Sequence, residues 1–113
     1  MVDLVSAMIR QDYIKRLIEQ VGEAIARALG KTGAGAQEQE EALQRVTHAY
    51  AELGIVPGFF ELEATSLRRM LGSPERIQAV AELCAWEAQL LELKGETARA
   101  AQRRRLARAL SAS

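Results

Sequence analysis

The sequence predicts an all-α protein, built as an antiparallel helical bundle or as a short array of helical hairpins. Of the 113 residues 49% are apolar, but only one Trp, two Tyr and two Phe are aromatic. Ala, Leu, Glu, Gln and Arg are abundant, and these residues favour helices. Apolar residues also recur at the spacing of one helix face, in stretches that each end at a glycine. We expect four longer helices and one short helix, folded as a single domain over residues 1–113.

The first long helix is predicted from the stretch DYIKRLIEQVGEAIARALG. Its apolar residues form one stripe: Ile14, Leu17, Ile18, Val21, Ile25, Ala28 and Leu29. Asp12 suits the N-cap, but the helix could also begin near Asp3 or Ser6. Residues 1–11 are therefore expected to be a flexible or a helix-extending N-terminal segment. Gly30 follows the last apolar position, where a helix C-cap favours glycine.

The stretch LGKTGAG invites comparison with a phosphate-binding loop. Such a loop needs a glycine five positions before the glycine of Gly-Lys-Thr, and that position is Ile25. It must also leave a strand and open into a helix, whereas this stretch leaves a helix. We therefore interpret residues 30–36 as a glycine-rich joint between two antiparallel helices and predict no nucleotide cofactor.

The middle of the chain predicts a second helix, a turn and a short helix. The second helix is acidic in its first turns and ends at Gly54; its apolar stripe is Leu43, Val46, Ala49, Tyr50 and Leu53. Pro57-Gly58 indicates a turn, beside which Phe59 and Phe60 are expected to fill the core. Thr65 or Ser66 could cap a short helix that carries Leu67, Met70 and Leu71 and ends at Gly72.

The fourth helix is predicted over Ser73 to Lys94, with Ser73 as N-cap and Gly95 as its stop. It carries two apolar arcs. One is centred on Cys84, and the other contains Ala79, Leu83, Trp86, Leu90 and Leu93. Either the helix is central, with neighbours on both sides, or the Trp86 arc meets another chain, since tryptophan is common at interface anchor points. The residues expected at an apolar protein interface are Leu83, Trp86, Leu90 and Leu93.

The last helix, ETARAAQRRRLARAL, is rich in arginine. Residues 96–113 carry five Arg and one Glu, a net charge of +4, whereas residues 37–63 carry six Glu and one Arg, a net charge of −5. Arg104, Arg105 and Arg108 are the expected charged contacts with a partner. Nucleic-acid binding is the alternative, because spread arginines can contact phosphates. No aromatic residue is interleaved for base stacking, so a protein contact is favoured.

Catalytic, cofactor-binding and metal-binding residues are not predicted. His48 and Cys84 are the only residues of their types and fall on different helices. We expect His48 to lie at the surface and Cys84 to behave as a small buried apolar residue. Glu82 and Glu87 are expected to be solvated or to cap helices. The chain is therefore predicted not to be an enzyme.

A cytoplasmic location is expected. A single cysteine permits no internal disulfide and fits a reducing compartment. The apolar run at the N-terminus is too short for a signal peptide, and no segment has the length needed to span a bilayer.

Two parts of the chain resemble known families. DYIKRLIEQVGEAIARALG, with a second helix ending in AYAELG, resembles short uncharacterised bacterial helical proteins that open with DYIxRLIEQ. AELCAWEAQLLELKGETARAAQRRRLARAL is similar to a degenerate tetratricopeptide-repeat hairpin, with Gly95, Ala100 and Ala107 at the small positions and Arg104 in place of the usual aromatic. The resemblances imply a helical interaction module. Together with the arcs and charges, they predict a non-enzymatic adaptor that binds another protein or itself.

Overall fold

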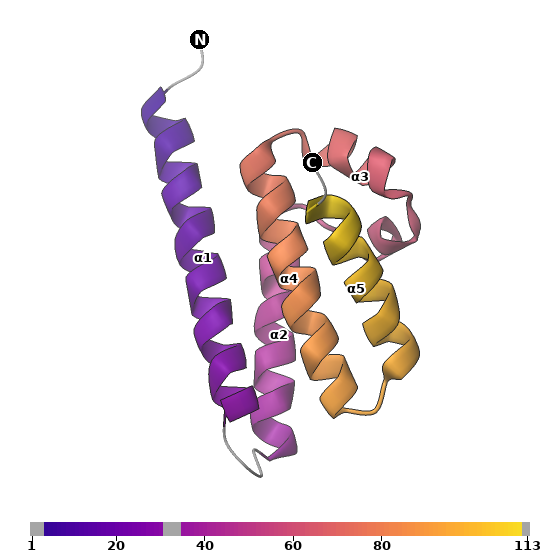
Figure 1. Ribbon diagram of the computed structural model, residues 1–113. Helices are drawn as coiled ribbons and strands as arrows, with labels where there is room; N and C mark the ends of the chain where they lie inside the picture. The colour runs from indigo at the N-terminus through magenta and orange to yellow at the C-terminus, as the bar shows by residue number, and fades with distance from the viewer. Residues whose placement is uncertain (1–3, 31–34, 112–113) are drawn as a thin grey trace.

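The computed structural model describes the backbone of residues 4–30 and 35–111, and the side chains of residues 12–30 and 35–111. These residues form helices and turns without any β-strand, which confirms the predicted all-α class. The elements in chain order are α1 (Leu4–Gly30), α2 (Ala36–Glu52), the 3-10 helix η1 (Pro57–Glu61), α3 (Ala64–Leu71), α4 (Pro74–Leu93) and α5 (Thr97–Ser111). Figure 1 shows that α1, α2, α4 and α5 run up and down in alternation, with the short α3 at one end.

Helix α1 begins earlier than its clearest sequence pattern. It starts at Leu4, so the N-terminal segment extends the helix from that residue onward. Residues 1–3, and residues 31–34 of the predicted joint, lie outside the described residues. In the part of the chain that the structure describes, no helix combines the length and the apolar character needed to cross a membrane.

The ends of the later helices follow local sequence signals. Ser73 caps α4 as predicted: its Oγ accepts a hydrogen bond of 3.2 Å from the backbone N–H of Arg76. The predicted N-cap of α3, Thr65 or Ser66, was wrong by two or three residues, because the helix already begins at Ala64 and Glu63 holds the N-cap position. The glycines that follow α2, α3 and α4 all have positive φ angles: Gly54 (80°), Gly72 (81°) and Gly95 (81°).

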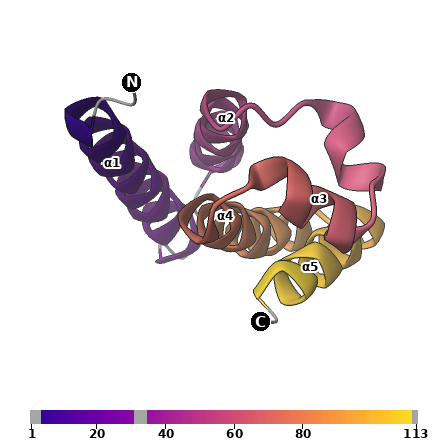
Figure 2. The same cartoon turned by 90° about the horizontal axis from the view of Figure 1, so that it is seen from above.

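Helix α4 lies at the centre of the molecule. It packs against α1, α2, α3 and α5, and Figure 2, looking along the bundle, shows it between the α1–α2 pair and the α3–α5 pair. A helix with neighbours on both sides buries most of both of its apolar arcs, which explains why its sequence is apolar almost all round. The sequence allowed two alternatives, a central α4 or an α4 with one arc facing another chain, and the structure shows the central arrangement.

The two sides of α4 differ in the size of the residues that pack there. Toward α5 the contact includes Ala88 and Ala100, which are fully buried, with Leu91 beside them. Small side chains let two helices approach closely, so α4 and α5 form the most extensive helix pair of the molecule. Phe59 of η1 is buried as predicted and adds to the larger core formed by the other helices.

Candidate interaction site

The predicted apolar interface divides into buried and exposed parts. Leu83 and Leu90 have no exposed surface, since α1, α2 and α5 cover α4. Trp86 is half-buried, and its indole Cη2 lies 3.1 Å from where a Cβ on Gly22 of α1 would stand. Leu93, at the end of α4, is 50% exposed. The four-residue interface is therefore corrected: Leu83 and Leu90 belong to the chain's own core, and Leu93 alone is largely exposed.

The contact between Gly22 and Trp86 makes a testable prediction. Alanine favours a helix interior over glycine by about 1 kcal/mol. We expect Gly22→Ala to gain none of this stability, because the new methyl group would press on the indole. In a Trp86→Leu background the same change should raise the free energy of unfolding by about 1 kcal/mol. A double-mutant cycle by urea denaturation measures the difference, and equal gains in both backgrounds would show that the contact is absent.

The arginines predicted as charged contacts are only partly free. Among the five arginines of α5, Arg99 pairs with Glu96 at 3.1 Å, Arg103 with the buried Glu87 at 2.6 Å, and Arg104 with Glu92. The hydrogen bond from Arg104 lowers the pKa of the Glu92 carboxyl.

Arg105 and Arg108 are exposed and have no ion-pair partner among the described residues. This pairing leaves two free guanidinium groups on α5, fewer than the five that the sequence offers to a nucleic-acid backbone.

A buried polar cluster between α2, α4 and α5 was missed by the sequence analysis, which expected Glu87 to be solvated or capping. The Nε of Arg103 donates to Oε1 of Glu87, and the Tyr50 hydroxyl donates to the same oxygen at 2.9 Å. The Arg103 guanidinium also stacks on the Phe60 ring, 3.7 Å from its centroid. The buried ion pair between Glu87 and Arg103 is therefore supported by the Tyr50 hydroxyl on the carboxylate and by the Phe60 ring on the guanidinium.

Burial also changes the proton affinities of this cluster. The pKa of the Tyr50 hydroxyl is raised well above its usual value, first by burial and then by the neighbouring Cys84 and Glu87. Burial raises the pKa of the Cys84 thiol to about 11, although the Tyr50 hydroxyl, 3.5 Å from its sulfur, opposes the shift. Cys84 is buried as predicted, and the fold favours its neutral form.

The raised thiol pKa predicts a loss of stability in alkali. The pKa of the folded state, about 11, exceeds the ordinary 9.0, so this contribution is complete below pH 9.0 and is lost as the pH rises toward 11. We expect the difference in free energy of unfolding between wild type and Cys84→Ala to shrink by about 2–3 kcal/mol over that range. Urea denaturation of both proteins at each pH measures it. A difference that stays constant would contradict a buried neutral thiol.

An open groove lies between α1 and α2, with a volume of about 400 Å³. Its floor contains the buried Leu17 and Val21, and its polar walls are formed by Tyr13, Arg16, Gln20, Arg45 and His48. We call this site the α1–α2 groove. Among the described side chains, the lining has two guanidinium groups and no carboxylate, so its chemistry favours an anionic occupant with some apolar surface.

Glu52 lies at the edge of this groove and is already engaged. Its carboxylate is 3.6 Å from Nε2 of His48, one turn earlier on α2. The pKa of the Tyr13 hydroxyl is raised, first by desolvation and then by the same carboxylate. His48 is exposed, as the sequence predicted. Arg16 and Arg45 remain without an ion-pair partner among the described residues.

Comparison with known proteins gives no guide to what these surfaces bind. Within residues 12–30 and 35–111, no three His, Cys, Asp or Glu side chains gather as metal ligands would. The resemblance of the opening helix to short bacterial proteins, and of the last two helices to a repeat hairpin, stays a prediction. No protein-family model, no curated protein and no solved structure matches this chain.

Proposed function

We propose that this protein is a non-enzymatic helical interaction module that associates with itself or with another protein in the cytoplasm. It would act by burying helix surface against a partner, with charged residues at the rim selecting that partner. Its free, buried cysteine fits a reducing compartment. Self-association is the form of this proposal that the geometry supports best.

The supporting observation is the length of α1. This helix has 27 residues, whereas its neighbours α2 and α4 have 17 and 20. At 1.5 Å per residue, α1 is longer than α4 by roughly 10 Å. Figures 1 and 2 agree that its first turns stand apart from the other described helices.

The sequence of this projecting segment, residues 4–11, is LVSAMIRQ. Four of its residues are large and apolar: Leu4, Val5, Met8 and Ile9. Most of the stability of helices in proteins comes from packing of an apolar face against a neighbour. A partner chain beside the projecting segment would supply that packing. The lining of the α1–α2 groove begins at Tyr13, directly after the projecting segment in α1, so one partner could cover both.

Light scattering after gel filtration tests the proposal. A full-length variant with Leu4, Val5, Met8 and Ile9 changed to glutamine keeps helix-forming residues but loses the apolar ones. We expect wild type to show a mass above the 12.4 kDa of one chain and the variant to approach that mass. A control with Ser6→Gln and Arg10→Gln should behave as wild type. Equal masses for wild type and the four-glutamine variant would show that the projecting segment is not part of the interface.

A further inference from the structure

We propose that the chain assembles head to tail, with the corner formed by Glu61, Leu62 and Glu63 of one copy seated in the α1–α2 groove of the next. This inference rests on the proposed self-association and specifies the two surfaces that meet. One surface supplies two arginines over an apolar floor, and the other supplies two glutamates beside an exposed leucine.

The receiving surface is the α1–α2 groove. Arg16 of α1 and Arg45 of α2 both line it, are exposed, and have no ion-pair partner among the described residues. Leu17 and Val21 lie beneath them and are buried to 7% and 1% exposure. The groove therefore offers two guanidinium groups with unused donors, which bind carboxylates strongly when the geometry is bidentate.

The inserting surface, which we call the acidic corner, lies between η1 and α3. Glu61 ends η1, and Glu63 holds the N-cap position of α3 without making a side-chain cap bond. Both are exposed and form no ion pair with any other described residue. Leu62 between them is 41% exposed, in extended backbone with φ −79° and ψ 155°. The acidic corner thus presents charge and apolar surface on a short irregular segment.

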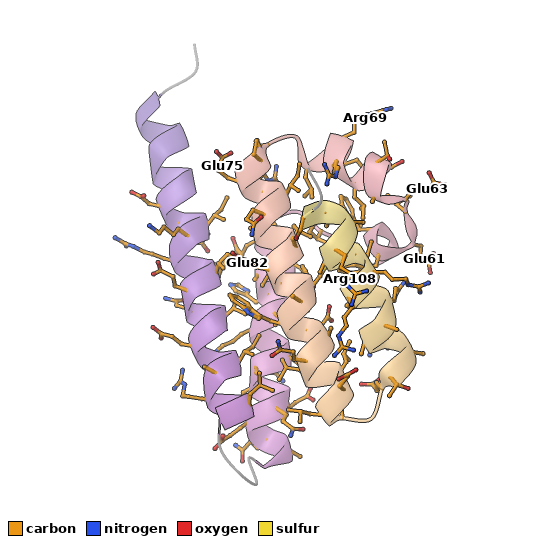
Figure 3. All side chains as sticks on the ribbon, viewed as in Figure 1. Glu61, Glu63, Arg69, Glu75, Glu82 and Arg108 are labelled. Carbon is orange, nitrogen blue, oxygen red and sulfur yellow. The ribbon has the colours of Figure 1, made fainter. Side chains whose placement is uncertain are left out.

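The two surfaces lie at opposite edges of the molecule. Figure 3 shows the labelled Glu61 and Glu63 at the edge farthest from α1, and Figure 2 places the η1–α3 segment across α4 from α1. One chain therefore cannot fill its own groove with its own corner. A contact between two different surfaces is heterologous, and it generates a ring if the rotation closes or an open chain if it does not.

Other glutamates fit the groove less well. Glu40 pairs with Lys94 at 3.1 Å, and Glu52 is engaged at the groove edge. Glu19 and Glu23 are exposed but lie on α1, which forms one wall of the groove itself. Their use would require two α1 helices to meet side by side, which is a symmetric contact and not a head-to-tail contact. The acidic corner is the exposed acidic pair that stands on the opposite edge.

Charge reversal tests this pairing with two full-length variants. The groove variant carries Arg16→Glu and Arg45→Glu, and the corner variant carries Glu61→Arg and Glu63→Arg. Each variant alone opposes like charges and should remain at 12.4 kDa under conditions where wild type is larger. An equimolar mixture of the two should regain the wild-type mass, because each groove then meets a corner of opposite charge. All four sites are exposed, so circular dichroism should show unchanged helix content.

Matched controls carry the same charge changes at sites outside both surfaces. Arg69→Glu with Arg27→Glu corresponds to the groove variant, and Glu75→Arg with Glu82→Arg corresponds to the corner variant; Figure 3 labels Arg69, Glu75 and Glu82. Both controls should keep the wild-type mass. Raising the salt from about 50 mM to about 500 mM should weaken wild-type association several-fold, because exposed charge pairs are screened.

The outcomes separate this inference from the proposal on which it rests. If wild type associates and the corner variant alone still associates, the head-to-tail pairing is wrong while self-association stands. If both variants are monomeric but their mixture does not regain mass, the two surfaces do not meet each other, and the inference is again overturned. A wild type that stays at 12.4 kDa contradicts both.

Discussion

Replacing Arg103 by methionine is expected to lower the free energy of unfolding by about 3–5 kcal/mol. The change leaves the Glu87 carboxylate buried, with the Tyr50 hydroxyl as its one remaining hydrogen-bond donor among the described residues. Removing the counter-ion of a buried charge lowers the free energy of unfolding far more than removing that of an exposed charge, because no water replaces the missing donor. It also removes the stacking of the guanidinium on Phe60. Urea denaturation followed by circular dichroism measures the loss.

The double variant Glu87→Leu/Arg103→Met is the matched control. Removing both charges and filling the space with apolar side chains is expected to leave stability close to wild type, or to increase it, because the desolvation of two ions disappears. Comparing the single with the double variant therefore separates the effect of the unpaired buried charge on stability from the effect of the changed side-chain volume. If Arg103→Met cost less than about 1 kcal/mol, the value typical of an exposed pair, the ion pair would not be buried as described.

Leu83→Ala is expected to destabilise the fold by about 2–5 kcal/mol, whereas Leu93→Ala should change stability by less than about 0.5 kcal/mol. Both residues belong to the same apolar arc of α4. Leu83 has no exposed surface, and its truncation leaves a cavity between packed helices. Leu93 is 50% exposed, so its loss leaves little space to fill. The same urea experiment serves for both.

This pair of variants tests the central position of α4. A small loss for Leu83→Ala would mean that the arc faces solvent or a second chain, as one interpretation of the sequence allowed. A large loss for Leu93→Ala under the same conditions would mean that the end of α4 is covered. The expected difference between the two variants follows from the packing of helices on both sides of α4, and the apolar pattern of the sequence alone does not predict it.

Much of the fold could be predicted from local patterns. Apolar spacing predicted α1 to α4, and a composition rich in Ala and Arg predicted α5, whereas η1 was predicted only as a turn at Pro57-Gly58. The positive φ angles of Gly54, Gly72 and Gly95 lie at the predicted stops of α2, α3 and α4. Ser73 and Pro74 fixed the start of α4. These signals act within one turn of helix, so they need no knowledge of the tertiary structure.

The tertiary relationships could not be predicted in the same way. A helical wheel shows that Leu83 and Leu90 share a face with Leu93, but not which neighbours cover that face. The ion pair between Glu87 and Arg103 depends on how α4 and α5 align across the turn at Gly95. Arg103 stands in a run of arginines, and only that alignment distinguishes it from the exposed Arg105.

The candidate interaction site was missed for a related reason. Arg16 and Arg45 come from two helices separated by the glycine-rich joint, and their own stretches give no sign that they line one groove. The sequence analysis looked instead for charge in the arginine-rich last helix. There, three of five arginines are paired within the chain.

The most direct test of the proposed self-association is the mass of the wild-type chain in solution over a wide range of concentration. Sedimentation equilibrium from micromolar to near-millimolar concentration at low salt measures it. We expect an average mass that rises above 12.4 kDa as the concentration increases. A mass that stays at 12.4 kDa throughout this range would contradict self-association.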